Sequence, residues 1–120
     1  MNDGKLRSWG MLGRARTSLR GFALGWRADR AVRDLWLALG AGWLLLAIVG
    51  VAPGWWVFVI VASAVALALE HLNTAIEALL DRLHPAHDPA IGMAKDLASA
   101  AAFAGNVAAG VAILAAAVLD

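Results

Sequence analysis

The sequence predicts an all-α membrane protein, with one amphipathic surface helix followed by three transmembrane helices. Of its 120 residues, 62% are hydrophobic and only 16% are charged, whereas soluble domains average roughly 45–50% apolar and about 25% charged residues. The apolar excess lies in three uncharged stretches, residues 35–51, 55–69 and 97–119. A membrane-spanning helix needs about 20 mostly apolar residues, and each stretch reaches that length with its helical flanks.

The first element, residues 1–30, is expected to be an amphipathic helix lying in the cytoplasmic membrane interface. Its apolar residues recur at helical spacings with arginines between them, as in helices that lie on anionic membranes. These apolar positions are Leu6, Trp9, Leu12, Leu19, Phe22 and Trp26. Glycines weaken the helix, so a disordered basic tail is the alternative. No nucleic-acid-binding module follows the arginines, and we expect no nucleic-acid partner.

Residues 31–120 form the second unit, with transmembrane helices expected at about 32–51, 55–82 and 94–119. Pro53 and Gly54 are expected to separate the first two. All but two of the ten Lys and Arg residues precede residue 35, and the exceptions, Arg82 and Lys95, lie between the second and third helices. Because basic residues favour the cytoplasmic side, we expect the N-terminus and the 82–96 loop in the cytoplasm and the C-terminus outside.

A polar stripe marks the second membrane helix. Glu70, Asn73, Glu77 and Asp81 fall on one helix face at about 100° per residue. Ionisable groups at membrane depth are costly and commonly functional. If the helix enters at residue 55 on the outer side, Glu70 and Asn73 reach the last turns within the bilayer, and Glu77 lies about 10 Å further along.

Charged residues on the neighbouring helices are expected at the level of this stripe. Asp29 precedes the first membrane helix, and Lys95 and Asp96 open the third. Carboxylate oxygens suit a hard cation such as Mg²⁺ that is held together with substrate phosphates. A carboxylate at the deeper, drier level is suited to act as a general base on a lipid hydroxyl. The pattern therefore favours phosphoryl transfer from a soluble nucleotide to a membrane alcohol.

The same residues resemble the signature of the prokaryotic diacylglycerol kinase family. That signature is Glu-x-x-Asn-Thr/Ser-Ala-Ile-Glu-x-x-x-Asp, followed by Ala-Lys-Asp-x-x-Ser/Ala-Ala; the matching segments here are residues 70–81 and 94–101. The resemblance implies a small homotrimeric kinase of the bacterial inner membrane. It would transfer the γ-phosphate of MgATP to diacylglycerol and give phosphatidic acid. One branch of the family phosphorylates undecaprenol, which stays open as the alternative substrate.

The resemblance also implies roles for individual residues. Glu70 matches the catalytic base, and Glu77 and Asp29 match the metal ligands, although Asp29 is one methylene shorter than the family's Glu. The positions implied to bind nucleotide are Glu77, Asp29, Lys95, Asp96, Thr17, Ala86, His87 and Asp88. The positions implied to contact the lipid or line the active site are Glu70, Asn73, Ser99, Ser18, Trp26 and Arg33.

Other functions and simpler roles remain open on the sequence. Glu70 would also serve a small proton-coupled transporter, although such a carboxylate is expected nearer the bilayer midplane and no inverted repeat is present. A non-catalytic subunit that docks through the stripe is a third possibility. Asp81 is expected to pair with Arg82 at the end of the helix. His71 lies off the polar stripe and is expected to be a bystander rather than a ligand. Asn106 is expected to contact a neighbouring helix or subunit.

The last transmembrane segment is rich in alanine and glycine, which predicts close helix packing. Three helices alone are not expected to shield Glu70 from acyl chains. A homo-oligomer with sites shared between subunits would solve this problem, and the family implies a trimer.

Overall fold

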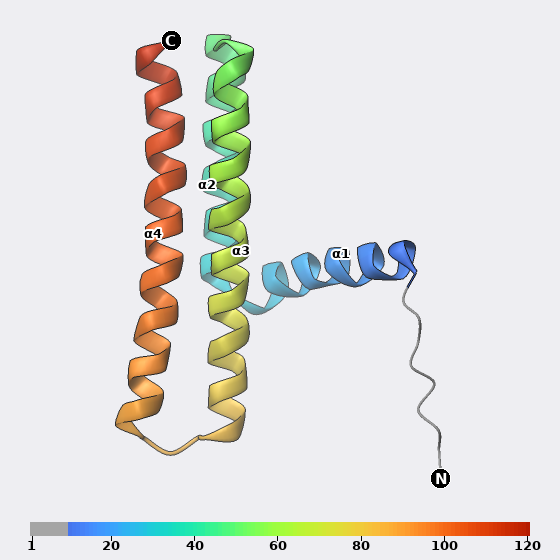
Figure 1. Ribbon diagram of the computed structural model, residues 1–120, viewed down its shortest axis with the longest axis vertical. Coiled ribbons are helices and arrows are strands. Elements are labelled where there is room, and N and C mark those ends of the chain that lie inside the picture. Colours follow the sequence, from blue (N-terminus) through green and yellow to red (C-terminus); the bar gives the residue numbers. More distant parts are fainter. Residues whose placement is uncertain (1–9) are drawn as a thin grey trace.

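The computed structural model describes residues 10–120, which form four α-helices and no strand. The helices are α1 (Met11–Ala28), α2 (Arg30–Val49), α3 (Pro53–Leu83) and α4 (Pro89–Leu119). Helices α2, α3 and α4 run side by side, and α1 projects sideways across their direction (Figure 1). All three bundle helices are long and apolar enough to cross a membrane. This confirms the predicted helical membrane fold, while Leu6 and Trp9 of the expected surface helix lie outside the described residues.

The break between α1 and α2 is a helix cap at Asp29. The backbone of Asp29 is extended, and its carboxylate accepts a hydrogen bond from the Ala31 amide at 2.8 Å. Such a cap satisfies one of the amide groups that the first turn of a helix leaves unpaired. The chain therefore turns from α1 into the bundle at this residue.

The turn between α2 and α3 lies slightly earlier than predicted. Gly50 ends α2 with a positive φ of 82°, a conformation that favours glycine, and its amide donates to the Leu46 carbonyl at 2.9 Å. Pro53 is the first residue of α3 and does not separate the helices, because proline suits a first helical turn. The C-terminal Asp120 reaches this turn and accepts a hydrogen bond from the Ala52 amide at 3.0 Å.

The opposite end of the bundle is a tight hairpin between α3 and α4. Helix α4 begins at Pro89 rather than near residue 94, because the Asp88 carboxylate caps it by accepting from the Ala90 amide at 2.8 Å. Helices α3 and α4 have 31 residues each, about 46 Å at 1.5 Å per residue. Both helices continue past the level of α1 before they meet the loop (Figure 1). The hairpin is therefore longer than a bilayer core of about 30 Å requires.

Small residues on α4 allow it to pack closely against α3. Ala102, Gly105 and Ala109 are buried at helical spacing. A Cβ at Gly105 would lie 3.2 Å from the Ala66 Cα atom, so a larger residue has no room there. The predicted close packing of this segment is confirmed at these positions, whereas a Cβ added at Gly110 would meet no atom of residues 10–120 within 4 Å.

The outer surface of the bundle is apolar. Large side chains such as Ile48 on α2, Phe58 on α3 and Phe103 on α4 are 66–75% exposed. Soluble monomers rarely expose so large an apolar surface to water. This surface fits acyl chains or further copies of the chain.

Candidate active site

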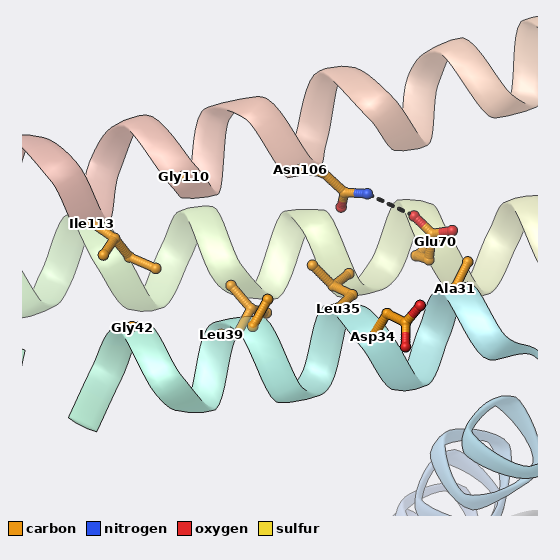
Figure 2. A pocket seen from close by; sticks show the side chains of 10 residues that line it. Ala31, Asp34, Leu35, Leu39, Gly42, Glu70, Asn106, Gly110 and Ile113 are labelled. Carbon is orange, nitrogen blue, oxygen red and sulfur yellow. Dashed lines mark hydrogen bonds between the residues drawn. The ribbon is translucent and has the colours of Figure 1, made fainter. Parts of the chain in front are cut away.

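The site begins with a buried carboxylate in the middle of the membrane bundle. Glu70 on α3 is only 5% exposed, and its Oε2 atom accepts a hydrogen bond from Asn106 Nδ2 on α4 at 2.9 Å (Figure 2). A buried carboxylate requires such a partner, because desolvation of the charge is otherwise costly. The single chain therefore buries most of Glu70, and the need for a second copy to enclose both a lipid cleft and a nucleotide site stays a prediction.

Asp29 lies beside the same part of α3. Its Oδ2 atom is 2.6 Å from the Thr74 hydroxyl, which also lies 3.1 Å from the Glu70 carbonyl. The capping residue of α2 is thereby connected to the polar stripe through one side chain. The predicted proximity of Asp29 to this stripe is found in the structure, and its role as a metal ligand stays a prediction.

One helical turn further along α3, Asn73 and Glu77 form the next level of the site. Asn73 Nδ2 donates to Glu77 Oε1 at 3.3 Å, and Asn73 is 8% exposed. The Asn73 Oδ1 atom is buried and finds no hydrogen-bond partner in the described part of the chain. A buried amide oxygen of this kind is available to accept from a ligand or water, or to bind a hard cation.

These groups fit Mg²⁺ only if a phosphate completes the coordination. Asp29, Glu77 and the Asn73 amide offer oxygen atoms, which are the ligands that Mg²⁺ prefers. Within residues 10–120, no three His, Cys, Asp or Glu side chains gather into a metal site. Mg²⁺ commonly uses one or two carboxylates together with substrate phosphates, so the donor set suits a metal that arrives with a nucleotide.

A cleft of about 620 Å³ runs between α2 and α4 and reaches Glu70. Its polar end contains Asp34, Glu70 and Asn106, whereas Leu39 and Ile113 line the part further from Glu70 (Figure 2). The apolar walls lie within the membrane-spanning part of the bundle. The cleft therefore has the chemistry to hold an alkyl chain with a polar group next to Glu70.

A separate charged contact joins α3 and α4 near the hairpin that connects them. Lys95 Nζ forms a salt bridge with Asp81, so the predicted pairing of Asp81 with Arg82 is wrong. The early start of α4 explains the difference, because it brings Lys95 alongside the last turns of α3. Lys95 would have to exchange this partner, or share it, in order to contact a nucleotide.

The structure does not bring the remaining candidate residues into this cluster. Thr17 and Ser18 are exposed on α1, where their hydroxyls donate to the Gly13 and Arg14 carbonyls of the same helix. Neither Asp96 nor Ser99 lines the cleft, and both are exposed. The other candidates, on α1, on the first turn of α2 and in the loop before α4, are Trp26, Arg33, Ala86, His87 and Asp88.

Sequence reasoning missed three contributors to the site. Thr74 belongs to the quoted motif but had no assigned role, and Asp34 had no assigned role either. The expected contact of Asn106 with a neighbouring helix or subunit is confirmed for the helix, and the sequence did not predict that its partner there is Glu70. A lone amide in an otherwise apolar segment was the available signal.

His71, predicted to be a bystander rather than a ligand, packs between α3 and α1. Its ring packs edge-on against Phe22, with centroids 5.1 Å apart, and lies under Gly25. Its Nδ1 atom lies 2.7 Å from the Leu67 carbonyl and is assigned as the donor. His71 therefore acts next to the site by fixing the surface helix.

Together these features define a multi-pass membrane protein with a buried carboxylate at the polar end of an apolar cleft. The family model described as prokaryotic diacylglycerol kinase matches residues 16–119, which is most of the chain. The chain thus belongs to the prokaryotic diacylglycerol kinase family, and it is a lipid kinase that transfers phosphate to an alcohol group. None of the curated proteins and none of the solved structures compared with it matches. Family membership favours the kinase over the transporter and the non-catalytic subunit.

Proposed function

We propose that this protein transfers the γ-phosphate of MgATP to diacylglycerol and produces phosphatidic acid. The observation that carries the proposal is the placement of Glu70, which is buried at the polar end of the α2–α4 cleft. A lipid in this cleft would lay its alkyl chain along Leu39 and Ile113 and present its hydroxyl to the carboxylate.

Glu70 is proposed as the general base. The Glu70 carboxylate accepts the proton of the lipid hydroxyl while the hydroxyl oxygen forms a bond to the γ-phosphorus. The bond between the γ-phosphorus and the oxygen that bridges it to the β-phosphate breaks, and ADP leaves with that oxygen. Glu70 then returns its proton to solvent or to the product phosphate.

The level beyond Glu70 is proposed to hold the nucleotide phosphates. Asp29, Glu77 and the unpartnered Asn73 oxygen would bind Mg²⁺, which neutralises phosphate charge when bound. Lys95 and Asp96 extend this level toward the α3–α4 hairpin and are proposed to contact ATP. The spacing between Glu70 and Glu77, about 10 Å along the axis, leaves room for the transferred phosphate between base and metal.

The membrane orientation and the assembly are also part of the proposal. The basic residues before α2 support a cytoplasmic N-terminus and α3–α4 hairpin in a bacterial inner membrane, with the C-terminus outside. The outer faces of the helices are apolar, and Ser99 is exposed. Both features support active sites that are completed by a second copy of the chain. The family implies a homotrimer.

The test is a comparison of lipid alcohols with purified protein in detergent. MgATP and dioleoylglycerol should give phosphatidic acid, and undecaprenol in a parallel reaction should give little or no product. A preference for undecaprenol would overturn diacylglycerol as the proposed substrate but would support the kinase activity. If neither lipid is phosphorylated, the proposed function is wrong.

A further inference from the structure

Asn106 places a polar amide in the middle of the apolar segment of α4. Between residues 97 and 119, Ser99 and Asn106 are the only side chains with hydrogen-bonding groups. Asn106 uses its Nδ2 atom to donate to Glu70 Oε2 at 2.9 Å, and both residues line the α2–α4 cleft. Within residues 10–120, the Glu70 carboxylate has no other hydrogen-bond donor.

Asn106 is only half satisfied. Its Oδ1 atom is buried and has no hydrogen-bond partner among residues 10–120, whereas its donor side contacts the carboxylate. A buried acceptor without a partner costs free energy, so a residue that served helix association alone would pair both ends of its amide. The contact that the structure retains is the one that acts on Glu70.

The location of Asn106 explains what this contact does. Along the cleft, Asn106 lies between the apolar part, marked by Gly110 and Ile113, and Glu70 (Figure 2). Its N–H group holds Oε2 from that side, which fixes the carboxylate and leaves Oε1 for a hydroxyl that enters the cleft. Hydrogen bonds to an ionised carboxylate are stronger than neutral ones, and the apolar surroundings strengthen them further.

The other polar groups around Glu70 do not replace this contact. Thr74 lies 3.1 Å from the Glu70 main-chain carbonyl and 2.6 Å from Asp29, so it does not bind the Glu70 carboxylate. Asp34 lines the same cleft from α2 but carries a negative charge and is paired with Arg30. A carboxylate offers no proton to Glu70 when ionised.

We propose that Asn106 is a positioning residue for the phosphoryl transfer, which holds the Glu70 carboxylate oriented toward the lipid hydroxyl. This inference rests on the proposed role of Glu70 as the base. A correctly aimed base affects the chemical step more than the binding of either substrate.

The variant Asn106→Leu removes the donor while it keeps the size of the side chain. It should lower kcat about 10- to 100-fold, the effect expected for a hydrogen bond to a charged group. The KM for MgATP should not change, because the nucleotide level is elsewhere. Asn106→Gln, which keeps an amide donor, should recover part of the lost kcat.

Gly105→Ala is the matched control for packing. It disturbs the neighbouring α3–α4 contact, because its Cβ would meet Ala66 and Leu69. It does not remove the hydrogen bond from Asn106 to the Glu70 carboxylate. It should lower thermal stability without the selective loss of kcat. If Asn106→Leu is as active as the wild type, or if its activity falls only in proportion to the folded fraction as in Gly105→Ala, the proposal is overturned.

Infrared spectroscopy provides a readout that does not depend on turnover. The carboxylate bands of Glu70 are identified as those absent in Glu70→Gln, and they should shift in Asn106→Leu but not in Gly105→Ala. Unshifted bands in Asn106→Leu would overturn the positioning role even in an active enzyme. If the wild type is inactive but the bands still shift in Asn106→Leu, the proposed function is refuted and the Asn106–Glu70 contact is confirmed.

Discussion

Two carboxylates on one face of α3 differ in their surroundings at the scale of single residues. Glu70 is buried, is held by Asn106 and borders an apolar cleft. Glu77 is half-buried, is held by Asn73 and lies beyond the Asp29–Thr74 contact. The first environment suits a base that acts on a lipid, and the second suits a ligand for a metal and phosphate.

This difference predicts opposite defects in two isosteric variants. Glu70→Gln should abolish turnover but bind a non-hydrolysable ATP analogue with Mg²⁺ as tightly as the wild type. Glu77→Gln should weaken that binding and raise the Mg²⁺ concentration needed for half-maximal activity. Calorimetric titration of the analogue and Mg²⁺ titration of the activity measure both effects.

Asp120→Asn is the control for the loss of one negative charge, since Asp120 lies at the opposite end of the bundle. It should change neither property. Equal loss of nucleotide binding in Glu70→Gln and Glu77→Gln would contradict the separation of the two levels.

At the scale of helices, α1 is fixed to the bundle by a close contact at Gly25. A Cβ at this position would lie 2.6 Å from two atoms of the His71 ring, while Phe22 packs on the same ring and against Trp36. The glycine therefore lets α1 approach α3 at His71, the residue next to Glu70. Asp29 and Thr74 make a second connection at the end of the same helix.

Gly25→Ala should consequently separate α1 from α3. Overpacking of this kind costs about 1–3 kcal/mol, which exceeds the helix-propensity gain of up to about 1 kcal/mol that alanine brings. Thermal unfolding should show a lower midpoint, and trypsin should cleave α1 faster at its arginines.

Gly21→Ala isolates the propensity effect, because nothing lies within 4 Å of a Cβ there. This control should be at least as stable as the wild type. The double variant Gly25→Ala/His71→Ala should recover the midpoint relative to Gly25→Ala. If Gly25→Ala and Gly21→Ala behave alike, the close contact does not fix α1.

The helices themselves were predictable from the sequence, but several of their ends and contacts were not. Apolar length and the spacing of the polar stripe are local properties, so three membrane helices and the shared face of Glu70 and Glu77 follow from them. The start of α4 depends on the contact of Asp88 with a backbone amide. The Asn106–Glu70 and Thr74–Asp29 contacts join residues 36 and 45 positions apart, which only the packing of helices determines.

At the scale of the whole molecule, one chain supplies a buried carboxylate, Glu70, but leaves its outer surface apolar and several candidate residues outside the site. Asp96 and Ser99 on α4 are exposed and do not line the cleft. A homo-oligomer would cover part of this surface and would let such residues complete a neighbour's site. Each active site would then combine groups from more than one chain.

Mixed oligomers test this arrangement. Glu70→Gln and Asp96→Asn protomers, each with little or no activity alone, should regain part of the activity when they are unfolded and reassembled together, because Glu70 of one chain and Asp96 of another would meet in one intact site. The regained activity should follow the mixing ratio, and each variant reassembled by itself serves as the control. Mixtures that form oligomers but never regain activity would place all essential groups in one chain.

The central claim is that Glu70 takes the proton of a lipid hydroxyl that receives the γ-phosphate of ATP. The most direct measurement follows labelled γ-phosphate from MgATP into lipid, with dioleoylglycerol and purified protein, in the wild type and in Glu70→Gln. We predict labelled phosphatidic acid from the wild type and none above background from folded Glu70→Gln. Full labelling by Glu70→Gln, or no labelled lipid from the wild type, would contradict the account.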